Sequence, residues 1–278
     1  MESKQMISTA VGDLEVRLLG EVAGRPTALL WHSLFVDSRS WHRVERELAE
    51  DRRLVLVTGP GHGASTDPGR RYTMEDCVDA AFSILDHLGI GEAVDWVGNA
   101  WGGHVGIMAA ARFPERCRSL VTFGTPVHSY TGAGRMQTAL LVLVYRLLGP
   151  RPFLVDAVIE VLLSERTRSE DPDAVALARD SFVTAGGLAN AVASISLRRP
   201  DITSLLPSVK APTLFITGAE HADWSPDQAR TASRLLPSGS AELIEGSSYL
   251  GPLEAPEEFT RLVREYWASH EPRRADAH

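Results

Sequence analysis

The sequence of 278 residues has few cysteines and no long hydrophobic run. Its two cysteines, Cys77 and Cys117, are far apart and lack the spacing of metal ligands, so we expect reduced core thiols, no metal site and a cytoplasmic protein. The longest apolar stretch, residues 139–148, is interrupted by Arg146, and the first residues lack the apolar core of a signal peptide. These absences predict a protein without a membrane partner.

The sequence also has fewer basic than acidic residues. The chain has 28 Lys and Arg residues against 36 Asp and Glu residues, which gives a formal net charge of −8 at pH 7. Affinity for nucleic acid depends largely on a basic surface that releases counterions from the phosphate backbone. We therefore expect no nucleic-acid partner and regard a hydrophobic small molecule as the expected ligand.

What the sequence does contain is an alternation of β-branched or aliphatic runs with amphipathic stretches. This alternation predicts a mostly parallel sheet covered by helices on both faces. The helices include residues 73–88, where apolar side chains recur on one face, and residues 256–268. The predicted strands are residues 14–19, 27–31, 53–58, 94–97, 117–123, 213–217 and 241–244.

Residues 125–200 interrupt this alternation, because they contain successive apolar helical segments and no strand-like run. An insertion of that length between two strands of a compact sheet is typical of a functional lid. We predict a core formed by residues 1–124 and 201–270, a helical lid over residues 125–200, and a frayed tail at residues 271–278.

The most informative motif is G-N-A-W-G-G at residues 98–103. It has the frame of a nucleophile elbow, G-x-S-x-G, in which a strained turn between a strand and a helix presents a serine. Here Ala100 stands at the serine position. The motif therefore predicts the turn and a pocket while removing the expected nucleophile.

Five motifs in order resemble the α/β-hydrolase fold superfamily over nearly the whole chain. They are H-S-L at residues 32–34, G-P-G-H-G-A-S at 59–65, the elbow at 98–103, the strand and glycine at 212–218, and the segment at 246–259. The resemblance implies the α/β-hydrolase fold with a helical lid. The G-N-x-x-G-G variant resembles the meta-cleavage-product hydrolases, which split carbon–carbon bonds.

By this resemblance, all three positions of the family's catalytic triad hold other residues. Ala100 has no heteroatom, so neither an acyl-serine nor an aspartyl ester can form there. Tyr249 stands at the histidine position, and a tyrosine with a pKa of about 10 is a poor base at neutral pH but can donate a hydrogen bond. His221 stands at the acid position, flanked by Glu220 and Asp223. Losing the serine or the histidine of such a triad costs on the order of 10⁶ in rate, so we expect no ordinary serine hydrolase activity.

An oxyanion hole needs none of these three side chains. The backbone N–H of Trp101 and that of Ser33 or Leu34 can converge on a carbonyl or enolate oxygen. We place Asn99 and His128 at the same pocket.

Two further interpretations concern basic residues. His32 is either a brace of its loop or a catalytic group, and both interpretations stay open at this point. Arg198 and Arg199 are interpreted as surface residues.

Three functions remain open. The first is an enzyme that uses the oxyanion donors for cyclisation, elimination, isomerisation or proton transfer, with Tyr249, Glu220 or Asp223 as acid and base. The second is a binder or sensor of a hydrophobic small molecule without turnover. The third is a hydrolase of an ester, lactone or carbon–carbon bond with relocated groups, in which His32, His128 or His221 activates water. None of them requires a cofactor, and the sequence does not indicate an oligomeric state.

Overall fold

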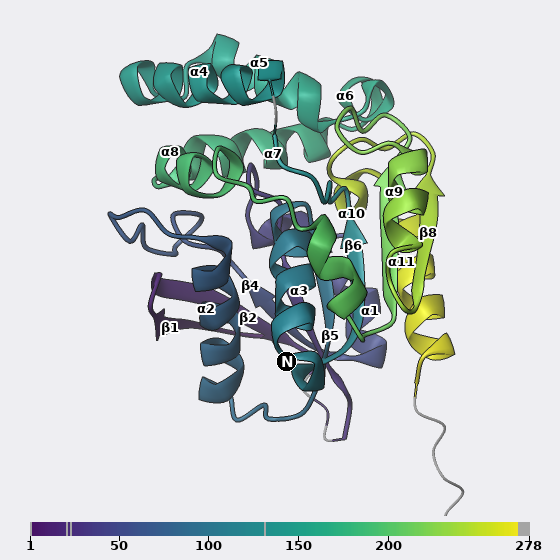
Figure 1. Cartoon of the computed structure of the whole chain (residues 1–278). Coiled ribbons are helices and arrows are strands. Elements are labelled where there is room, and N and C mark those ends of the chain that lie inside the picture. The colour runs from purple at the N-terminus through teal and green to yellow at the C-terminus, as the bar shows by residue number, and fades with distance from the viewer. Residues whose placement is uncertain (1, 21, 23, 131, 272–278) are drawn as a thin grey trace, which may run out of the picture.

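A single mixed sheet organises the part of the chain that the computed structural model describes, residues 2–20, 22, 24–130 and 132–271. Its eight strands lie in the order β1-β2-β4-β3-β5-β6-β7-β8 (Figure 1). β2 pairs antiparallel with β1 and β4, and all other neighbours are parallel. The bounds are Ser3–Thr9 (β1), Gly12–Leu19 (β2), Thr27–Trp31 (β3), Arg53–Val57 (β4), Val94–Asn99 (β5), Cys117–Phe123 (β6), Thr213–Gly218 (β7) and Gly239–Ile244 (β8).

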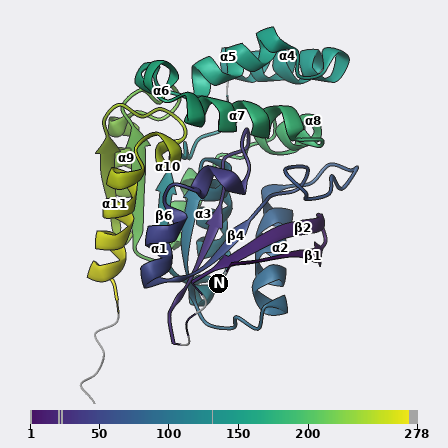
Figure 2. The same ribbon diagram turned by 180° about the vertical axis from the view of Figure 1, so that it is seen from behind.

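Alternate residues of the central strands serve two separate cores, one on each face of the sheet. In β3, Leu29 and Trp31 pack into the core that includes α2 and α3, whereas Ala28 and Leu30 pack into the core that includes α1 and α11. A parallel strand covered on both faces needs apolar side chains at successive positions, because these point to opposite faces. The two covered faces can be followed in Figures 1 and 2.

Local signals set the helices around this sheet. α2 begins with a capping box, in which Thr73 and Asp76 each bond the other's backbone N–H, and α11 begins at a proline. The helices of the core are Glu45–Asp51 (α1), Met74–His87 (α2), Trp101–Arg112 (α3), Pro226–Ser233 (α9), Gly251–Glu254 (α10) and Pro256–Ser269 (α11).

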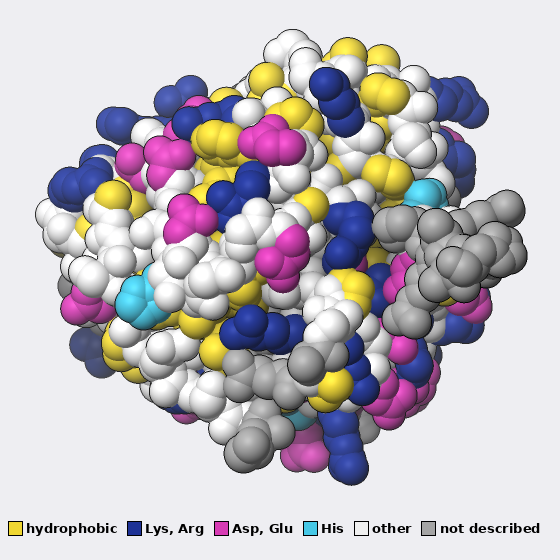
Figure 3. Space-filling model, turned by 90° about the horizontal axis from the view of Figure 1, so that it is seen from below, with side chains coloured by type: hydrophobic (Ala, Val, Ile, Leu, Met, Phe, Trp, Pro, Cys, Tyr) yellow, Lys and Arg dark blue, Asp and Glu magenta, His cyan; other side chains and the backbone are white. Residues whose placement is uncertain are grey.

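The helical insertion, residues 125–200, lies between β6 and β7 in the sequence and covers the carboxyl ends of the strands (Figure 1). Its helices are Gly132–Leu148 (α4), Pro152–Leu162 (α5), Glu165–Glu170 (α6), Pro172–Thr184 (α7) and Leu188–Ala191 (α8), followed by a π-helical turn at Val192–Ser196 (η3). None of the described helices is long and apolar enough to cross a membrane. The opposite end of the molecule mixes basic and acidic side chains (Figure 3).

The predicted α/β fold is confirmed, and each of the seven predicted strands is present. β1 was not predicted, because Ser3–Thr9 contains only two apolar residues, of which Met6 is exposed and Ile7 is buried. In the predicted tail, Glu271 pairs with Arg52, and residues 272–278 lie outside the described residues.

Candidate active site

The turn between β5 and α3 keeps the geometry of a nucleophile elbow although the nucleophile is absent. Ala100 has φ 47° and ψ −98°, and among the described residues no other non-glycine residue has a positive φ. A Cβ atom at Gly98 would collide with the backbone of Gly102, and one at Gly102 with the carbonyl oxygen of Trp31. Such backbone strain costs about 1–3 kcal/mol and persists only where the surroundings enforce it. The sequence G-N-A-W-G-G thus builds the strained turn around an alanine.

Two residues that line the cavity beside Ala100, Leu34 and Trp101, are candidates for backbone donors. Trp101 begins α3, Leu34 follows β3, and both line the cavity together with Ser33. In the described part of the chain, the N–H groups of Leu34 and Trp101 have no acceptor. The two segments are held together because the Gly102 N–H donates to the His32 carbonyl oxygen at 3.3 Å. These are the donors that the sequence predicts for an oxyanion hole.

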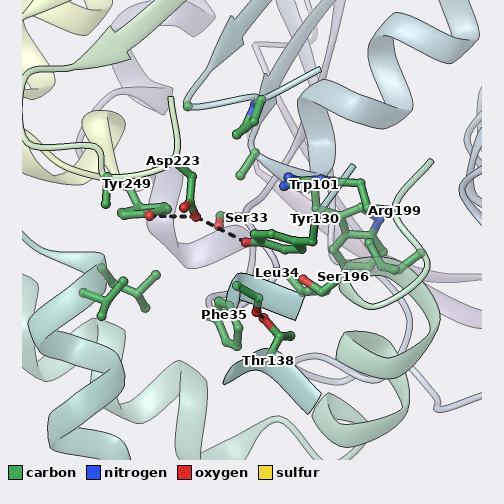
Figure 4. A pocket seen from close by; sticks show the side chains of 18 of the residues that line it. Ser33, Leu34, Phe35, Trp101, Tyr130, Thr138, Ser196, Arg199, Asp223 and Tyr249 are labelled. Carbon is green, nitrogen blue, oxygen red and sulfur yellow. Dashed lines mark hydrogen bonds between the residues drawn. The ribbon is translucent and has the colours of Figure 1, made fainter. Parts of the chain in front are cut away.

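Asp223 and Tyr249 meet at the opposite wall of this site. The Tyr249 hydroxyl donates to Asp223 Oδ2 at 3.0 Å, and the Tyr130 hydroxyl donates to the same oxygen at 3.3 Å (Figure 4). The ring of His221 stacks on the ring of Tyr249, with 3.7 Å between centroids. Tyr249, at the expected histidine position, is therefore hydrogen-bonded to Asp223, two residues after the expected acid position that His221 holds.

Burial fixes the protonation of the groups around Asp223. Desolvation, followed by the charge of Asp223, raises the pKa of Tyr249 far above its ordinary value, so its hydroxyl remains a donor. Desolvation is also the main cause that raises the pKa of Tyr130. Burial lowers the pKa of His221 to about 4, which makes the ring neutral at pH 7. His221 Nδ1 accepts the Asp223 backbone N–H at 3.2 Å, so the ring proton is on Nε2, which has no partner among the described residues.

Arg199 also belongs to this polar cluster. It was interpreted as a surface residue from the sequence, but it lines the cavity. Its guanidinium lies 3.9 Å from the centroid of the Tyr130 ring, and the residue lines the cavity. Burial lowers the pKa of Arg199, while the phenol of Tyr130 and the charge of Asp223 act in the opposite direction. A cation and a carboxylate thus share one end of the cavity.

Apolar side chains form most of the remaining wall. The cavity has a volume of about 450 Å³ and lies between the elbow and the helical insertion. Apolar lining residues include Leu34, Phe35, Leu141, Val158 and Ile195. An apolar cavity with a few converging polar groups is the usual form of a small-molecule site.

Several predicted site residues lie elsewhere. Both ring nitrogens of buried His32 bond the backbone: Nδ1 lies 2.7 Å from the Ser33 carbonyl oxygen, and Nε2 accepts the Gly59 N–H at 2.8 Å. Burial, followed by the charge of His62, lowers the pKa of His32 to about 3. His32 does not line the cavity, so the structure favours the first of its two interpretations, a brace of its loop, over a catalytic role.

Glu220, Asn99 and His128 also lie outside the cavity lining. The Glu220 carboxylate accepts the N–H of Glu165 at 3.1 Å, which directs it to the first residue of α6. Asn99 donates to the carbonyl oxygens of Phe123 and Tyr249, at 3.2 and 3.0 Å, and so joins the elbow to the Tyr249 segment. His128 lies beside Trp224.

Sequence reasoning missed Tyr130 and Arg199. Both belong to the helical insertion, and no spacing in the sequence relates them to Asp223. The one available signal was position, because Tyr130 follows β6 at the carboxyl end of the sheet, where sites of open α/β sheets lie.

The site therefore combines a carboxylate, two phenol donors and two backbone N–H groups, without a side-chain nucleophile at Ala100. This set can move protons and stabilise a negative oxygen. The described residues hold no cluster of three metal-ligating side chains.

Comparisons with known proteins agree with this fold. Residues 26–145 match the family model of the alpha/beta hydrolase fold. A 2-hydroxymuconate semialdehyde hydrolase of Pseudomonas sp. (strain CF600) is 40% identical over 87 residues, which are 31% of this chain and 30% of that enzyme. The chain thus spans under a third of that relative. A 2-hydroxymuconate semialdehyde hydrolase of Pseudomonas putida is 26% identical over 230 residues, 79% of this chain and 78% of that one. The solved structure of a thermophilic esterase from Thermogutta terrifontis is similar with a TM-score of 0.87 at 25% identity, covering 97% of this chain and 100% of the esterase.

Proposed function

Because the chain belongs to the α/β-hydrolase fold superfamily and carries alanine at the nucleophile position, we propose that it is an enzyme that transfers protons on a hydrophobic carbonyl compound. The reaction forms no acyl intermediate. The observation that carries this proposal is the Asp223 carboxylate, which lines the cavity and accepts the Tyr249 hydroxyl at 3.0 Å. The helical insertion would act as the lid of this cavity.

In the proposed mechanism, Asp223 removes a proton from the carbon next to the substrate carbonyl. The electron pair of that C–H bond moves onto the carbonyl oxygen, which accepts hydrogen bonds from the N–H groups of Leu34 and Trp101. Where the substrate has a β,γ double bond, return of the proton from Asp223 to the γ-carbon of the dienolate gives isomerisation. Departure of a leaving group from the β-carbon, which takes the proton from Asp223, gives elimination. Attack of the enolate carbon on a second carbonyl of the same molecule gives cyclisation.

The tyrosines support the base in this scheme. Their raised pKa values keep them protonated at neutral pH, so they hold Asp223 by donation and position its free oxygen. They exclude water from one side of the carboxylate. A carbonyl substrate also agrees with the relatives, since two of them are named for a semialdehyde.

Hydrolysis by relocated groups is disfavoured by the histidines. A water-activating base needs a free imidazole nitrogen on the cavity side. His221 uses Nδ1 to accept the Asp223 N–H and carries its proton on Nε2, and both nitrogens of His32 bond the backbone.

The test is deuterium exchange from D₂O into a panel of hydrophobic ketones and enol lactones, followed by mass spectrometry. Asp223→Asn should lower the exchange rate by about 10²–10⁴-fold, the range expected for loss of a general base. Glu220→Gln is the matched control, because that carboxylate lies outside the cavity lining, and it should exchange like the parent.

Two results would contradict the proposal. Saturable binding of panel members without any exchange would identify a non-catalytic binder. Hydrolysis of the lactones at the same rate by the parent and by Asp223→Asn would identify relocated hydrolytic groups.

A further inference from the structure

The longest helix of the insertion, α4, lines the cavity with one face and carries exposed apolar side chains on the opposite face. At 3.6 residues per turn, Gly134, Thr138 and Leu141 share one face, and all three line the cavity. The opposite face carries large apolar side chains in contact with solvent. Their exposed fractions are 71% for Met136, 58% for Leu140, 53% for Leu143 and 72% for Leu147.

This exposed stripe continues beyond the helix. Leu148, the last residue of α4, is 48% exposed, and Phe153, the second residue of α5, is 58% exposed. Monomeric soluble proteins rarely expose a contiguous apolar patch of this kind without a use for it. We call Met136, Leu140, Leu143, Leu147, Leu148 and Phe153 the α4 apolar face.

The cavity opens beside the same helices. Most lining residues are buried or half-buried, and the exposed ones are Gln137 on α4, Ala157 and Val161 on α5, and Ala222. Three of these four exposed lining residues thus belong to α4 and α5, the helices that carry the α4 apolar face.

The charged residues of α4 and of the turn that follows it are all arginines, whereas α5 carries Asp156 and Glu160. Residues 124–155 contain Arg135, Arg146 and Arg151 and no Asp or Glu, although the whole chain has a net charge of −8. The three arginines are exposed, and none forms an ion pair with another described residue. Arg135 and Arg146 are eleven residues apart, about three turns, so they lie on the same flank of α4.

Neighbouring segments add to this positive edge. Burial lowers the pKa of Arg71, and the charges of Arg146 and Arg198 lower it further, which places these three cations near one another. The nearby acid Asp156 of α5 is already paired with Arg179 of α7. By contrast, basic and acidic side chains are mixed at the opposite end of the molecule (Figure 3).

We propose that the α4 apolar face docks on an anionic lipid bilayer. A helix with exposed Leu, Met and Phe side chains flanked by arginines lies in the plane of an interface, with its apolar side chains among the acyl chains and its cations at the anionic headgroups. This mode of binding needs no spanning helix, and it differs from the expectation of no membrane partner, which stays a prediction. A second copy of the chain fits less well, because a two-fold contact of this face would bring arginines together without acidic partners.

Co-sedimentation with vesicles tests this inference without any substrate. The parent should bind vesicles that contain about one third phosphatidylglycerol, and bind pure phosphatidylcholine vesicles far less. The double variant Leu140→Gln/Leu143→Gln should lose at least about 10-fold in partition coefficient, because two anchoring side chains no longer enter the acyl region. Arg135→Gln/Arg146→Gln should lose about 25-fold, since each arginine near an anionic surface contributes about five-fold.

The controls come from exposed residues outside the insertion. Leu235→Gln changes a leucine that is 41% exposed after α9, and Arg261→Gln changes an exposed arginine of α11. Both should bind vesicles like the parent. Circular dichroism would show that all variants remain folded.

Three outcomes would overturn the inference. They are no binding of the parent to anionic vesicles, an equal loss of binding in Leu235→Gln, and a dimer in analytical ultracentrifugation that Leu140→Gln/Leu143→Gln separates. The last would assign the face to a second copy of the chain. Because these side chains point away from the cavity, failure here leaves the proposed proton transfer untouched, and failure of the exchange assay leaves this surface untouched.

Discussion

Replacing Ala100 by glycine should stabilise the protein, although glycine usually destabilises. Ala100 is held at φ 47° and ψ −98°, a conformation that costs a residue with a Cβ atom about 1–3 kcal/mol. Glycine relieves this strain but loses about 0.4–1 kcal/mol through the greater freedom of the unfolded chain. The Ala100 methyl group lines the cavity, so its removal leaves no void in the core.

The net expectation is a gain of about 1 kcal/mol in the free energy of unfolding, which raises the midpoint of thermal unfolding by about 2 °C in a chain of this size. Urea unfolding and calorimetry measure both quantities. The Trp101 N–H is unchanged in this variant, so exchange activity should persist.

Ala139→Gly is the matched control, because Ala139 is exposed within α4. Glycine there should cost about 1 kcal/mol, as it does in a helix interior. If Ala100→Gly were as stable as the parent or less stable, the elbow would hold no strain, and the account of the turn given above would be refuted.

Three further outcomes concern the polar cluster. Tyr249→Phe removes one of the two hydroxyl donors to Asp223. It should lower the rate of D₂O exchange at least about 10-fold and the free energy of unfolding in urea by about 1–3 kcal/mol. An unchanged exchange rate would show that this donor is not used. His221 has a folded pKa of about 4 against about 6.5 unfolded, so the unfolded chain binds more protons between these values and the free energy of unfolding falls as the pH drops through this window. His221→Gln should reduce this pH dependence by up to about 1.4 kcal/mol per pH unit, measured by urea unfolding at several pH values. An identical curve for the variant and the parent would contradict the assigned pKa. Ala100→Ser/Tyr249→His places a hydroxyl on the elbow and an imidazole beside Asp223, so hydrolysis of activated esters should rise at least about 10-fold above the parent, and no gain would show that Asp223 cannot orient that imidazole.

The sheet and its order of elements were accessible from the sequence, because they depend on local patterns. A strand such as Thr27–Trp31 consists of residues that favour a buried strand, and the glycines of the elbow allow a close approach that other residues would block. The residues at the three triad positions could be identified for the same reason, because the motifs around them fix the alignment with the family pattern.

The polar cluster was less accessible, because long-range contacts decide it. Glu220 and Asp223 are three residues apart and equally eligible by sequence, yet only Asp223 points into the cavity. The choice depends on how the chain turns after β7. Tyr130 reaches Asp223, and Arg199 reaches the ring of Tyr130, only because the helical insertion folds back over the sheet. Nothing in their neighbours along the chain indicates these contacts.

The Asn99 amide, which bonds the backbone of both Phe123 and Tyr249, has a consequence for the thermodynamics of ligand binding. It ties the segment that carries Tyr249 to the central strands, so the direction of the Tyr249 hydroxyl is set before any ligand arrives. A site whose donors are already in place loses little conformational entropy on binding, and more of the contact energy remains for affinity. The side chains on this side of the cavity are therefore ordered by the fold before the ligand binds.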